Sequence, residues 1–255
     1  MTGVPEYKII FETEKKSNYA VVIPVINEGK RIISLLSKFQ KLNLKNIDLI
    51  IVDGGSTDQS LEKIQEKGVD TLILKLGLGK LGAQLRCAYH YCLNRGYRGV
   101  ITIDGNDKDD PSAIPQFIKK LEEGFDFVQA SRFIPGGEEK NTPLTRKLAI
   151  RLIHAPLLSL SSGFQWTDTT QGFRAYSANL LSSKDINIFR DIFNNYELLF
   201  YLSHIAPRLG FKCVEVPSRR SYPKGKVPTK INGFTGNIKV LWTLIKVITG
   251  GFNNK

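Results

Sequence analysis

The sequence predicts one large α/β domain built on a mostly parallel sheet, and three observations support this fold class. The chain has 255 residues, of which 42% are hydrophobic, which suits a single large core. Short apolar runs rich in β-branched residues alternate with segments of helical periodicity through its first half. These runs are hydrophobic throughout, as is typical of strands that helices cover on both faces.

The apolar runs locate the strands and the intervening helices. Strands are expected at residues 19–25, 47–53, 71–74 and 99–104, with a return to extended structure at 125–131. Helices are expected over 32–42, from the cap Ser56-Thr57-Asp58 to Gly68, and from the loop KLGLGKLG through Tyr91. A further helix begins at Pro111, because proline suits the first helical turn, with Asp109 or Asp110 as its cap.

The second half of the chain is mostly helical. Helices are expected over 143–160 and 194–209, a strand over 211–217, and an amphipathic closing helix over 233–249. We therefore divide the chain into an N-terminal extension (1–18), the α/β domain (19–217), and a basic loop with a helix packed on that domain (218–255).

Positive charge gathers toward the C-terminus. The chain has 36 Lys and Arg against 24 Asp and Glu, a formal charge of +12. From Ser203 onward there are ten basic residues and one acid, Glu215. Such a tail indicates an anionic partner, which could be nucleic acid, an acidic membrane surface or a phosphorylated ligand.

Cysteine and histidine usage excludes two further classes. Three cysteines without a C-x-x-C pair, and three histidines, fit neither a disulfide scaffold nor a structural zinc site. The N-terminus does not resemble a signal peptide, and Lys or Gly interrupts the long apolar stretches. We therefore expect a cytoplasmic protein.

Acidic side chains follow three of the four early strands. PVINE closes the first strand, VDGGSTD the second and IDGNDKDD the fourth. Ligands of an open parallel sheet bind beyond the carboxyl ends of its strands. Converging carboxylates repel one another unless a cation or a donor-rich ligand lies among them. The oxygen ligands at 104–110 therefore predict a divalent cation that bridges the oxygens of a diphosphate.

Other α/β classes fit less well. A response-regulator fold needs an acid pair directly after the first strand, where this chain has PVINE, and is about half this length. The chain has no P-loop, and no G-x-G-x-x-G follows its first strand. The segment GLGKLG around Lys80 matches neither pattern in its context.

Seven motifs together resemble the family 2 glycosyltransferases of the GT-A fold. PVINE, VDGGSTDQS and IDGNDKDDP are similar to that family's P-x-Y-N-E, V-D-D-x-S-x-D-G-T and D-A-D-x-x-H-x-P. ASRFIPGG resembles its G-S-R-Y-x-x-G-G, and TRKLAIR, DTTQGFRAYS and YELLFYLSHIAPRLGFKCVEVP follow in the family's order. The chain looks most like the dolichol-phosphate or polyprenyl-phosphate mannosyltransferase branch, over residues 19–250.

This resemblance implies a binding site for a GDP- or UDP-sugar. Pro24, Ile26 and Glu28 would line the base pocket, with Ile26 where the family usually has Tyr. Ile51 and Asp53 would hold the base and the ribose. The other donor-binding residues implied are Lys80, Asp104, Gly105, Asn106, Arg132, Arg220 and Lys226. Arg220 and Lys226 match an R-x-x-x-x-x-K over the diphosphate, where Lys224 or Lys230 could substitute for Lys226.

The resemblance also implies Mg²⁺ or Mn²⁺, held by Asp104 and Asn106 at the family's D-x-D. Neutral Asn106 replaces the second acid, and Lys108 stands where Gln is common. Three explanations stay open: Asp107 takes over coordination, the metal binds weakly, or Lys108 supplies part of the metal's charge.

The catalytic residues implied are Asp104, Arg132, Arg146 and Asp168. Arg132 and Arg146 would face the sugar and the acceptor phosphate, because a guanidinium suits phosphate oxygens. A lipid phosphate is already an anion and attacks without a general base. A sugar hydroxyl would need one, and Asp168 is the candidate by family position, although it could instead bond the turn before Gly172.

We therefore expect an inverting transferase that moves a mannose- or glucose-type sugar to a polyprenyl or dolichyl phosphate. It would lie peripherally on the cytoplasmic membrane face and have no nucleic-acid partner. One alternative is transfer to a sugar hydroxyl in cell-surface polysaccharide assembly. Another is a non-enzymatic binder of polyanions or phospholipids, which leaves the strand-end acids unexplained because they would repel a polyanion.

Overall fold

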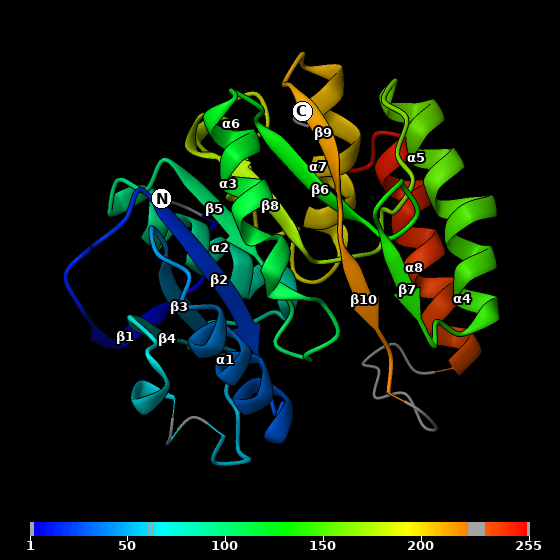
Figure 1. Ribbon diagram of the computed structural model, residues 1–255. Coiled ribbons are helices and arrows are strands. Elements are labelled where there is room, and N and C mark those ends of the chain that lie inside the picture. Colours follow the sequence, from blue (N-terminus) through cyan, green and yellow to red (C-terminus); the bar gives the residue numbers. More distant parts are fainter. Residues whose placement is uncertain (1–2, 61, 63, 224–232, 254–255) are drawn as a thin grey trace.

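A mixed sheet of eight strands forms the centre of the molecule, with helices on both faces (Figure 1). The computed structural model describes residues 3–60, 62, 64–223 and 233–253. The strand order is β1-β4-β3-β2-β5-β8-β6-β9. Its strands are β1 (Tyr7–Glu12), β2 (Tyr19–Val25), β3 (Asp48–Asp53), β4 (Thr71–Lys75), β5 (Gly99–Thr102), β6 (Phe127–Ser131), β8 (Arg174–Ser177) and β9 (Cys213–Pro217).

Six of these strands run in one direction, and β1 and β8 run against them. A second, two-stranded parallel sheet pairs β7 (Glu138–Lys140) with β10 (Arg219–Ser221). The helices are α1 (Lys30–Leu42), α2 (Leu81–Asn94), α3 (Ile114–Glu122), α4 (Leu144–Ala149), α5 (Ala155–Ser162), α6 (Ala178–Ser182), α7 (Glu197–Arg208) and α8 (Gly233–Ile248). One turn of π-helix, Ile150–His154, joins α4 to α5 without a break.

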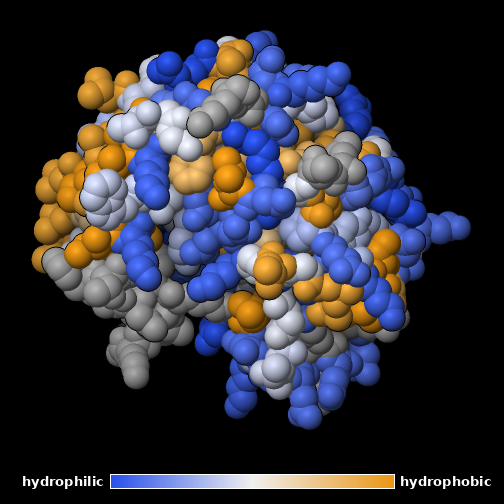
Figure 2. All heavy atoms as spheres, turned by 180° about the vertical axis from the view of Figure 1, so that it is seen from behind, coloured by the Kyte–Doolittle hydropathy of each residue, from blue (hydrophilic) through white to orange (hydrophobic). Residues whose placement is uncertain are grey.

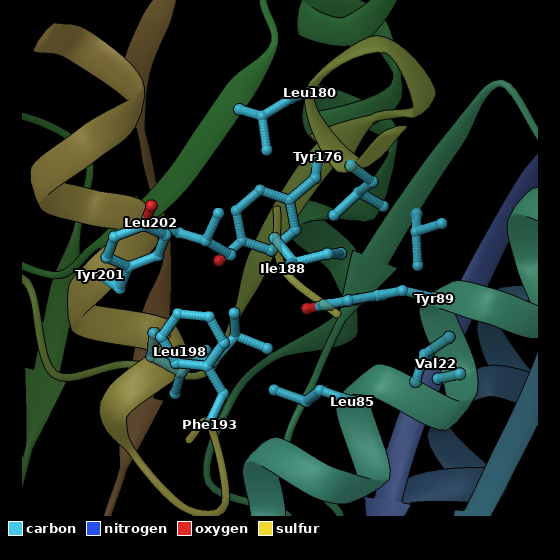
Figure 3. Packing of buried hydrophobic residues seen from close by; sticks show 14 of the residues in the cluster. Val22, Leu85, Tyr89, Tyr176, Leu180, Ile188, Phe193, Leu198, Tyr201 and Leu202 are labelled. Carbon is cyan, nitrogen blue, oxygen red and sulfur yellow. The ribbon is translucent and has the colours of Figure 1, made fainter. Parts of the chain in front are cut away.

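The two faces of the sheet bury two hydrophobic clusters. Along β2, Val21 and Ile23 face the cluster under α1 and α3, while Ala20 and Val22 face the cluster under α2 and α7. This alternation follows from the two-residue period of a strand, and every one of these positions is apolar because helices cover both faces. Figure 3 shows the second cluster, in which Tyr89 and Tyr176 pack edge to face with ring centroids 5.9 Å apart.

The predicted fold class is confirmed, and the strands expected at 19–25, 47–53, 71–74, 99–104, 125–131 and 211–217 are present with small shifts of their ends. The helix expected from Ser56 to Gly68 is wrong, since the described residues there contain only a 3-10 turn at Gln65–Lys67. Asp58 accepts hydrogen bonds from the Gly29 and Ser60 backbone N–H groups, at 2.8 and 3.2 Å, so its carboxylate ties the loop to the start of α1.

Two strands of the eight-stranded sheet were missed from the sequence, as were β7 and β10 of the small sheet, where β10 lies in the predicted basic loop. β1 lies in the segment taken as an N-terminal extension, and it pairs antiparallel with β4 at the sheet edge. β8 has four residues and lies between β5 and β6, antiparallel to both. Because β8 runs backwards, it begins at the edge where the parallel strands end, and the loop before it reaches that edge.

The C-terminal helix packs on the same body as the sheet. α8 contacts α7 and α5, and its Leu244 and Val247 are fully buried in the cluster that also holds α2. None of the helices in the described ranges combines the length and the apolar character that a membrane crossing requires.

Candidate active site

The candidate site lies along the edge where β2, β3, β5 and β6 end. The chain passes from β2 to β3 on one side, and β5 lies on the other side of β2, so the strand order changes direction between β2 and β5. Ligands of open α/β sheets bind in the crevice at such a switch point. The structure therefore brings the strand-end acids and arginines predicted from the sequence to one edge.

Three predicted donor residues lie at the ends of β2 and β3. Pro24 is partly exposed, and Glu28 is buried with its carboxylate 2.7 Å from Arg31. Asp53 is also buried, and its carboxylate accepts hydrogen bonds from the Ser56 N–H at 3.0 Å and the Ser56 hydroxyl at 2.6 Å. These carboxylates are thus held in fixed positions by local donors.

The ends of β2 and β3 are joined by a buried glutamine from α2. The Gln84 side-chain amide donates to the carbonyls of Val25 and Val52, each at 2.8 Å. Ile26 follows β2 directly and is partly exposed. Lys80 precedes α2, and its side chain is exposed at the same edge while its N–H donates to the Asn194 carbonyl at 2.7 Å.

Ile51 is a correction to the predicted base pocket. Its side chain is fully buried in the cluster under α1 and α3, together with Val21 and Ile23. In a strand whose side chains alternate between two covered faces, a residue two positions before the strand end points into the core. The side chain of Ile51 therefore packs in the core and does not line a pocket.

The loop after β5 carries the predicted metal-binding residues. The Asn106 amide donates to the Asp104 carboxylate at 3.3 Å, and its oxygen accepts from the Lys108 N–H at 3.2 Å. Gly105 lies against the β2 end, where an added Cβ would be 3.2 Å from the Pro24 carbonyl oxygen. A Cβ on Gly172 would be 2.3 Å from an Asp104 oxygen, so only glycine at 172 leaves the carboxylate in place.

The acids that follow Asp104 turn away from it or serve other partners. Asp107 has a φ of 58° and points at α1, where it contacts the Ser34 hydroxyl at 2.6 Å and the Lys38 ammonium at 2.7 Å. Asp110 caps the helix as predicted, accepting from the Ser112 N–H at 3.0 Å. The described residues contain no group of three or more His, Cys, Asp or Glu that could hold a metal alone. Asp104 and Asn106 remain the metal candidates of this loop.

The basic segment before the C-terminal helix lies beside this acidic loop. The Ser221 N–H donates to the Lys108 carbonyl at 2.8 Å, and the Asp110 N–H donates to the Arg219 carbonyl at 3.1 Å. Between these two bonds the guanidinium of Arg220 forms an ion pair with Asp109 and comes within 3.6 Å of Asp104. Lys226, like Lys224 and Lys230, lies outside the described residues.

Arg220 and Asp109 form an almost completely buried pair. Burial raises the pKa of the Asp109 carboxyl, and the neighbouring Arg220 opposes that rise. The second carboxylate oxygen of Asp109 has no hydrogen-bond partner among the described residues. The acidic loop therefore has, close to Asp104, a carboxylate oxygen that accepts no hydrogen bond from the described residues.

Arg132 and Asp168 form a second buried pair, at the end of β6. The Arg132 Nε and Nη2 atoms lie 2.6 and 3.2 Å from the two Asp168 oxygens, and the Gln171 amide donates to the same carboxylate at 2.5 Å. Glu215 of β9 accepts from the N–H groups of Thr167 and Asp168, at 2.9 and 3.1 Å. Asp168 has no exposed surface. Its surroundings suit a residue that positions Arg132.

Tyr222 joins the arginines of the site, and it was missed from the sequence. Its hydroxyl lies 3.5 Å from Arg132, 3.4 Å from Arg146 and 3.3 Å from Arg220. The Lys108 ammonium lies 5.2 Å from its ring centroid. Burial opposes ionisation of this hydroxyl, but the guanidinium groups of Arg220, Arg132 and Arg146 outweigh burial and lower the pKa of Tyr222 to about 7.

We call Lys108, Arg132, Arg146 and Arg220 the basic cluster. Its cations come from the loops after β5 and β6, from α4 and from β10, and Tyr222 is the group they share. Guanidinium groups gathered beside a strand-end carboxylate can bind phosphate oxygens with planar, paired hydrogen bonds. A tyrosine inside the run RRSYPKGK was the only local signal for this arrangement.

An open cavity of about 320 Å³ lies beside the Arg132–Asp168 pair. Its lining residues are Phe133, Arg151, Ala155, Pro156, Ser159, Gln165, Trp166 and Thr167. Phe133 follows Arg132 and Thr167 precedes Asp168, so both sides of the ion pair continue into the cavity wall. The remaining wall comes from the π-helical turn, from α5 and from the loop that follows α5.

A mixed sheet with carboxylates and arginines at its C-terminal edge is the arrangement of a GT-A glycosyltransferase. The chain belongs to glycosyl transferase family 2, whose family model matches residues 20–183. It is 31% identical over 234 residues to an uncharacterized protein of Methanocaldococcus jannaschii, covering 90% of this chain and 92% of the relative. It is also 25% identical to the undecaprenyl-phosphate mannosyltransferase of Micrococcus luteus, covering 77% of this chain and 80% of that protein.

Solved structures confirm the fold. The glucosyl-3-phosphoglycerate synthase of Mycobacterium tuberculosis, crystallised with Mn²⁺, UDP-glucose and phosphoglyceric acid, matches with a TM-score of 0.64 and 19% sequence identity. The match covers 91% of this chain and 79% of that one. Fold and family together make the protein a glycosyltransferase of the type that the sequence motifs predicted.

Proposed function

We propose that the protein transfers a sugar from a nucleoside diphosphate sugar to a polyprenyl phosphate, with inversion at the anomeric carbon. The observation that carries the proposal is the basic cluster next to Asp104, because it offers several guanidinium groups to two phosphate-bearing substrates at once. The names of the Micrococcus luteus relative and of the polyprenol monophosphomannose synthase of Mycolicibacterium smegmatis, 24% identical over 202 residues, point to the same acceptor class.

The donor would lie at the ends of β2, β3 and β5. Asp53 and Glu28 are candidates for the ribose and the base, and the base would be guanine or uracil. Asp104 would face the diphosphate, with its carboxylate partly exposed to solvent. Arg220 lies within 3.6 Å of Asp104, where it can neutralise the second phosphate of the donor.

The loop fits a divalent cation that the substrate helps to hold. Mg²⁺ is commonly bound by one or two carboxylates together with substrate phosphates. Asp104 and Asn106 would supply the protein ligands, and Asp109 keeps an oxygen without a hydrogen-bond partner among the described residues. Bound there, Mg²⁺ or Mn²⁺ would neutralise the charge that develops on the leaving diphosphate.

Departure of the diphosphate is the step that the arginines assist. Donors fixed in advance around a developing negative charge lower the barrier, because they need no reorganisation during the reaction. Arg220 and Lys108 would stabilise the leaving diphosphate, and Arg132 and Arg146 would bind the acceptor phosphate. Their shared contact with Tyr222 keeps the four side chains close despite their mutual repulsion.

The burial of Asp168 favours a phosphate acceptor over a hydroxyl acceptor. A phosphate attacks as an anion and needs no general base, whereas a sugar hydroxyl must lose a proton. Both Asp168 oxygens already accept hydrogen bonds from Arg132, and Gln171 binds one of them. Asp168 then holds Arg132 at the angle that meets the acceptor phosphate. The reaction would take place at the cytoplasmic face of a membrane, where the lipid and the nucleotide sugar meet.

Glycolipid formation tests this function. The purified full chain is incubated with GDP- and UDP-sugars, Mg²⁺ or Mn²⁺, and a short-chain polyprenyl phosphate, and lipid products are identified by mass spectrometry. We expect one donor to give a polyprenyl-phosphate sugar that chelation with EDTA prevents, with the anomeric configuration inverted. The absence of a glycolipid from every donor would refute the proposal.

A further inference from the structure

An apolar surface runs along the helices next to the site. Leu144, Leu148, Leu152 and Leu160 are 67%, 47%, 69% and 87% exposed, and Trp242 of α8 is 59% exposed. We call these five residues the leucine face. Single exposed leucines are ordinary, but several on adjoining helices make a surface that soluble monomers rarely show.

The elements that carry the leucine face contact one another. Leu144, Leu148 and Leu152 recur every four residues along α4 and the π-helical turn, so they lie along one side. α8 packs against α5, which brings Trp242 to the same flank. Figure 2 shows apolar side chains gathered at the left edge of the molecule, the flank that α4, α5 and α8 form in Figure 1.

The charges around this face have one sign. Residues 144–162 and 233–248 together contain five Lys and Arg and no Asp or Glu. Lys147 forms an ion pair with Glu139, and Arg146 contacts Tyr222. The side chains of Arg151, Lys239 and Lys246 are exposed. The face therefore combines an apolar stripe with exposed positive charge.

One aromatic ring contacts both an arginine beside this face and an arginine of the basic cluster. The Phe133 ring centroid is 5.3 Å from the Arg132 guanidinium and 5.7 Å from the Arg151 guanidinium. Arg132 belongs to the buried pair of the site, whereas Arg151 is exposed among the leucines. The cavity lined by Phe133, Arg151 and Trp166 opens in the same place. The cavity therefore lies between the exposed Arg151 and Phe133, the residue that follows Arg132.

We propose that the leucine face docks on an anionic lipid bilayer, with Leu152, Leu160 and Trp242 entering the interface and Arg151, Lys239 and Lys246 contacting lipid phosphates. The inference rests on the proposed function only in taking a lipid as the acceptor. Cations beside apolar side chains fit a membrane surface, where apolar burial and attraction to anionic lipids add together. A second copy of this chain is a poorer occupant, because a two-fold contact would bring the same cations against one another.

Vesicle flotation tests the docking surface. The full chain is mixed with vesicles of phosphatidylcholine and phosphatidylglycerol in equal parts, and the bound fraction is compared with that of Leu152→Gln/Leu160→Gln. We expect vesicle binding about tenfold weaker for each leucine removed. This factor corresponds to the free energy gained when an apolar side chain of this size moves from water into the membrane interface. Glutamine keeps the helix propensity of leucine, and both side chains are exposed in the free protein, so folding is retained.

Two further variants sharpen the comparison. Leu42→Gln/Leu78→Gln removes leucines that are 39% and 94% exposed at the end of α1 and before α2, outside the leucine face, and should bind vesicles like wild type. Lys239→Gln/Lys246→Gln should weaken binding to the mixed vesicles about fivefold per lysine and leave binding to pure phosphatidylcholine unchanged.

Equal loss of binding in the leucine-face and control variants would overturn the inference. So would sedimentation of the lipid-free wild type as a dimer that Leu152→Gln/Leu160→Gln dissociates. The outcome is separable from that of the proposed function. If the protein makes glycolipid in detergent and Leu152→Gln/Leu160→Gln still binds vesicles normally, the proposed function holds and the docking surface is wrong. If the leucine face is needed for vesicle binding but no glycolipid forms, the docking surface holds and the proposed function is wrong.

Discussion

The substitution Asp168→Asn tests whether Asp168 positions Arg132 or acts as a general base. In the native protein one Asp168 oxygen accepts from the Arg132 Nε at 2.6 Å and from the Gln171 amide at 2.5 Å. The other oxygen accepts from the Arg132 Nη2 at 3.2 Å. The substituted side chain keeps one oxygen and turns the other into an amide group that faces donors, which leaves the Arg132 charge buried without its counterion.

The cost in stability follows from burial. The Arg132 and Asp168 side chains are 1% and 0% exposed, and removing one partner of a buried pair costs about 3 kcal/mol or more. For a chain of this size the midpoint of thermal unfolding should fall by roughly 10 °C. Glu138→Gln is the matched control, because Glu138 pairs with Arg219 where both side chains are more than half exposed. The control should cost less than about 1 kcal/mol.

A double-mutant cycle assigns the role of Asp168. Glycolipid formation is measured for Asp168→Asn, Arg132→Gln and the double variant, at a temperature where all three are folded. If Asp168 acts through Arg132, each single change lowers turnover about 100-fold and the double variant loses no more than Arg132→Gln alone. A further drop in the double variant, or a stability loss below about 1 kcal/mol for Asp168→Asn, would show that Asp168 does not act through Arg132.

Three further predictions concern the rest of the site. The pKa of Tyr222 is lowered from 10.0 to about 7 in the folded protein, so the stability lost in Tyr222→Phe should be small below pH 7 and should grow as the pH rises toward 10. Urea unfolding at several pH values measures this difference, and a constant difference would contradict it. Gly172→Ala should displace the Asp104 carboxylate and weaken Mn²⁺ binding in the presence of nucleoside diphosphate about tenfold or more, which calorimetric titration would detect. Asp104→Asn should lower metal-dependent transfer about 100-fold, whereas Asp107→Asn should leave turnover within about threefold, because Asp107 faces Ser34 and Lys38. Equal losses in these two variants would place the metal elsewhere.

The sequence predicted the parts of the fold that depend on local pattern. Buried strands such as β2 and β3 are continuous apolar runs, which made them recognisable. The rule that ligands bind beyond the strand ends was enough to predict that Asp53 and Asp104 lie at one edge of the sheet. β8 was not predicted because a strand of four residues is too short to show a clear periodicity. β1 was not predicted because four of its six residues are exposed at the sheet edge, so it does not form an apolar run.

The site was predictable in its charges but not in its pairings. Arg132 and Arg220 were expected near phosphates, yet their partners Asp168 and Asp109 are 36 and 111 positions away along the chain. No local pattern encodes such contacts, since tertiary packing decides them. Tyr222 was missed for the same reason, because its role depends on arginines from two other segments. Ile51 was misplaced because a family position does not reveal which face of a strand a side chain takes.

Transfer to a phosphate rather than to a hydroxyl is the claim on which the account depends. Matched incubations with a short polyprenyl phosphate and with the corresponding polyprenol, under the same nucleotide sugar and Mn²⁺, test it most directly. We predict a sugar-phosphate linkage in the first incubation and no glycosylated lipid in the second. Glycosylation of the free alcohol, or of a sugar hydroxyl while the polyprenyl phosphate stays unmodified, would contradict the account.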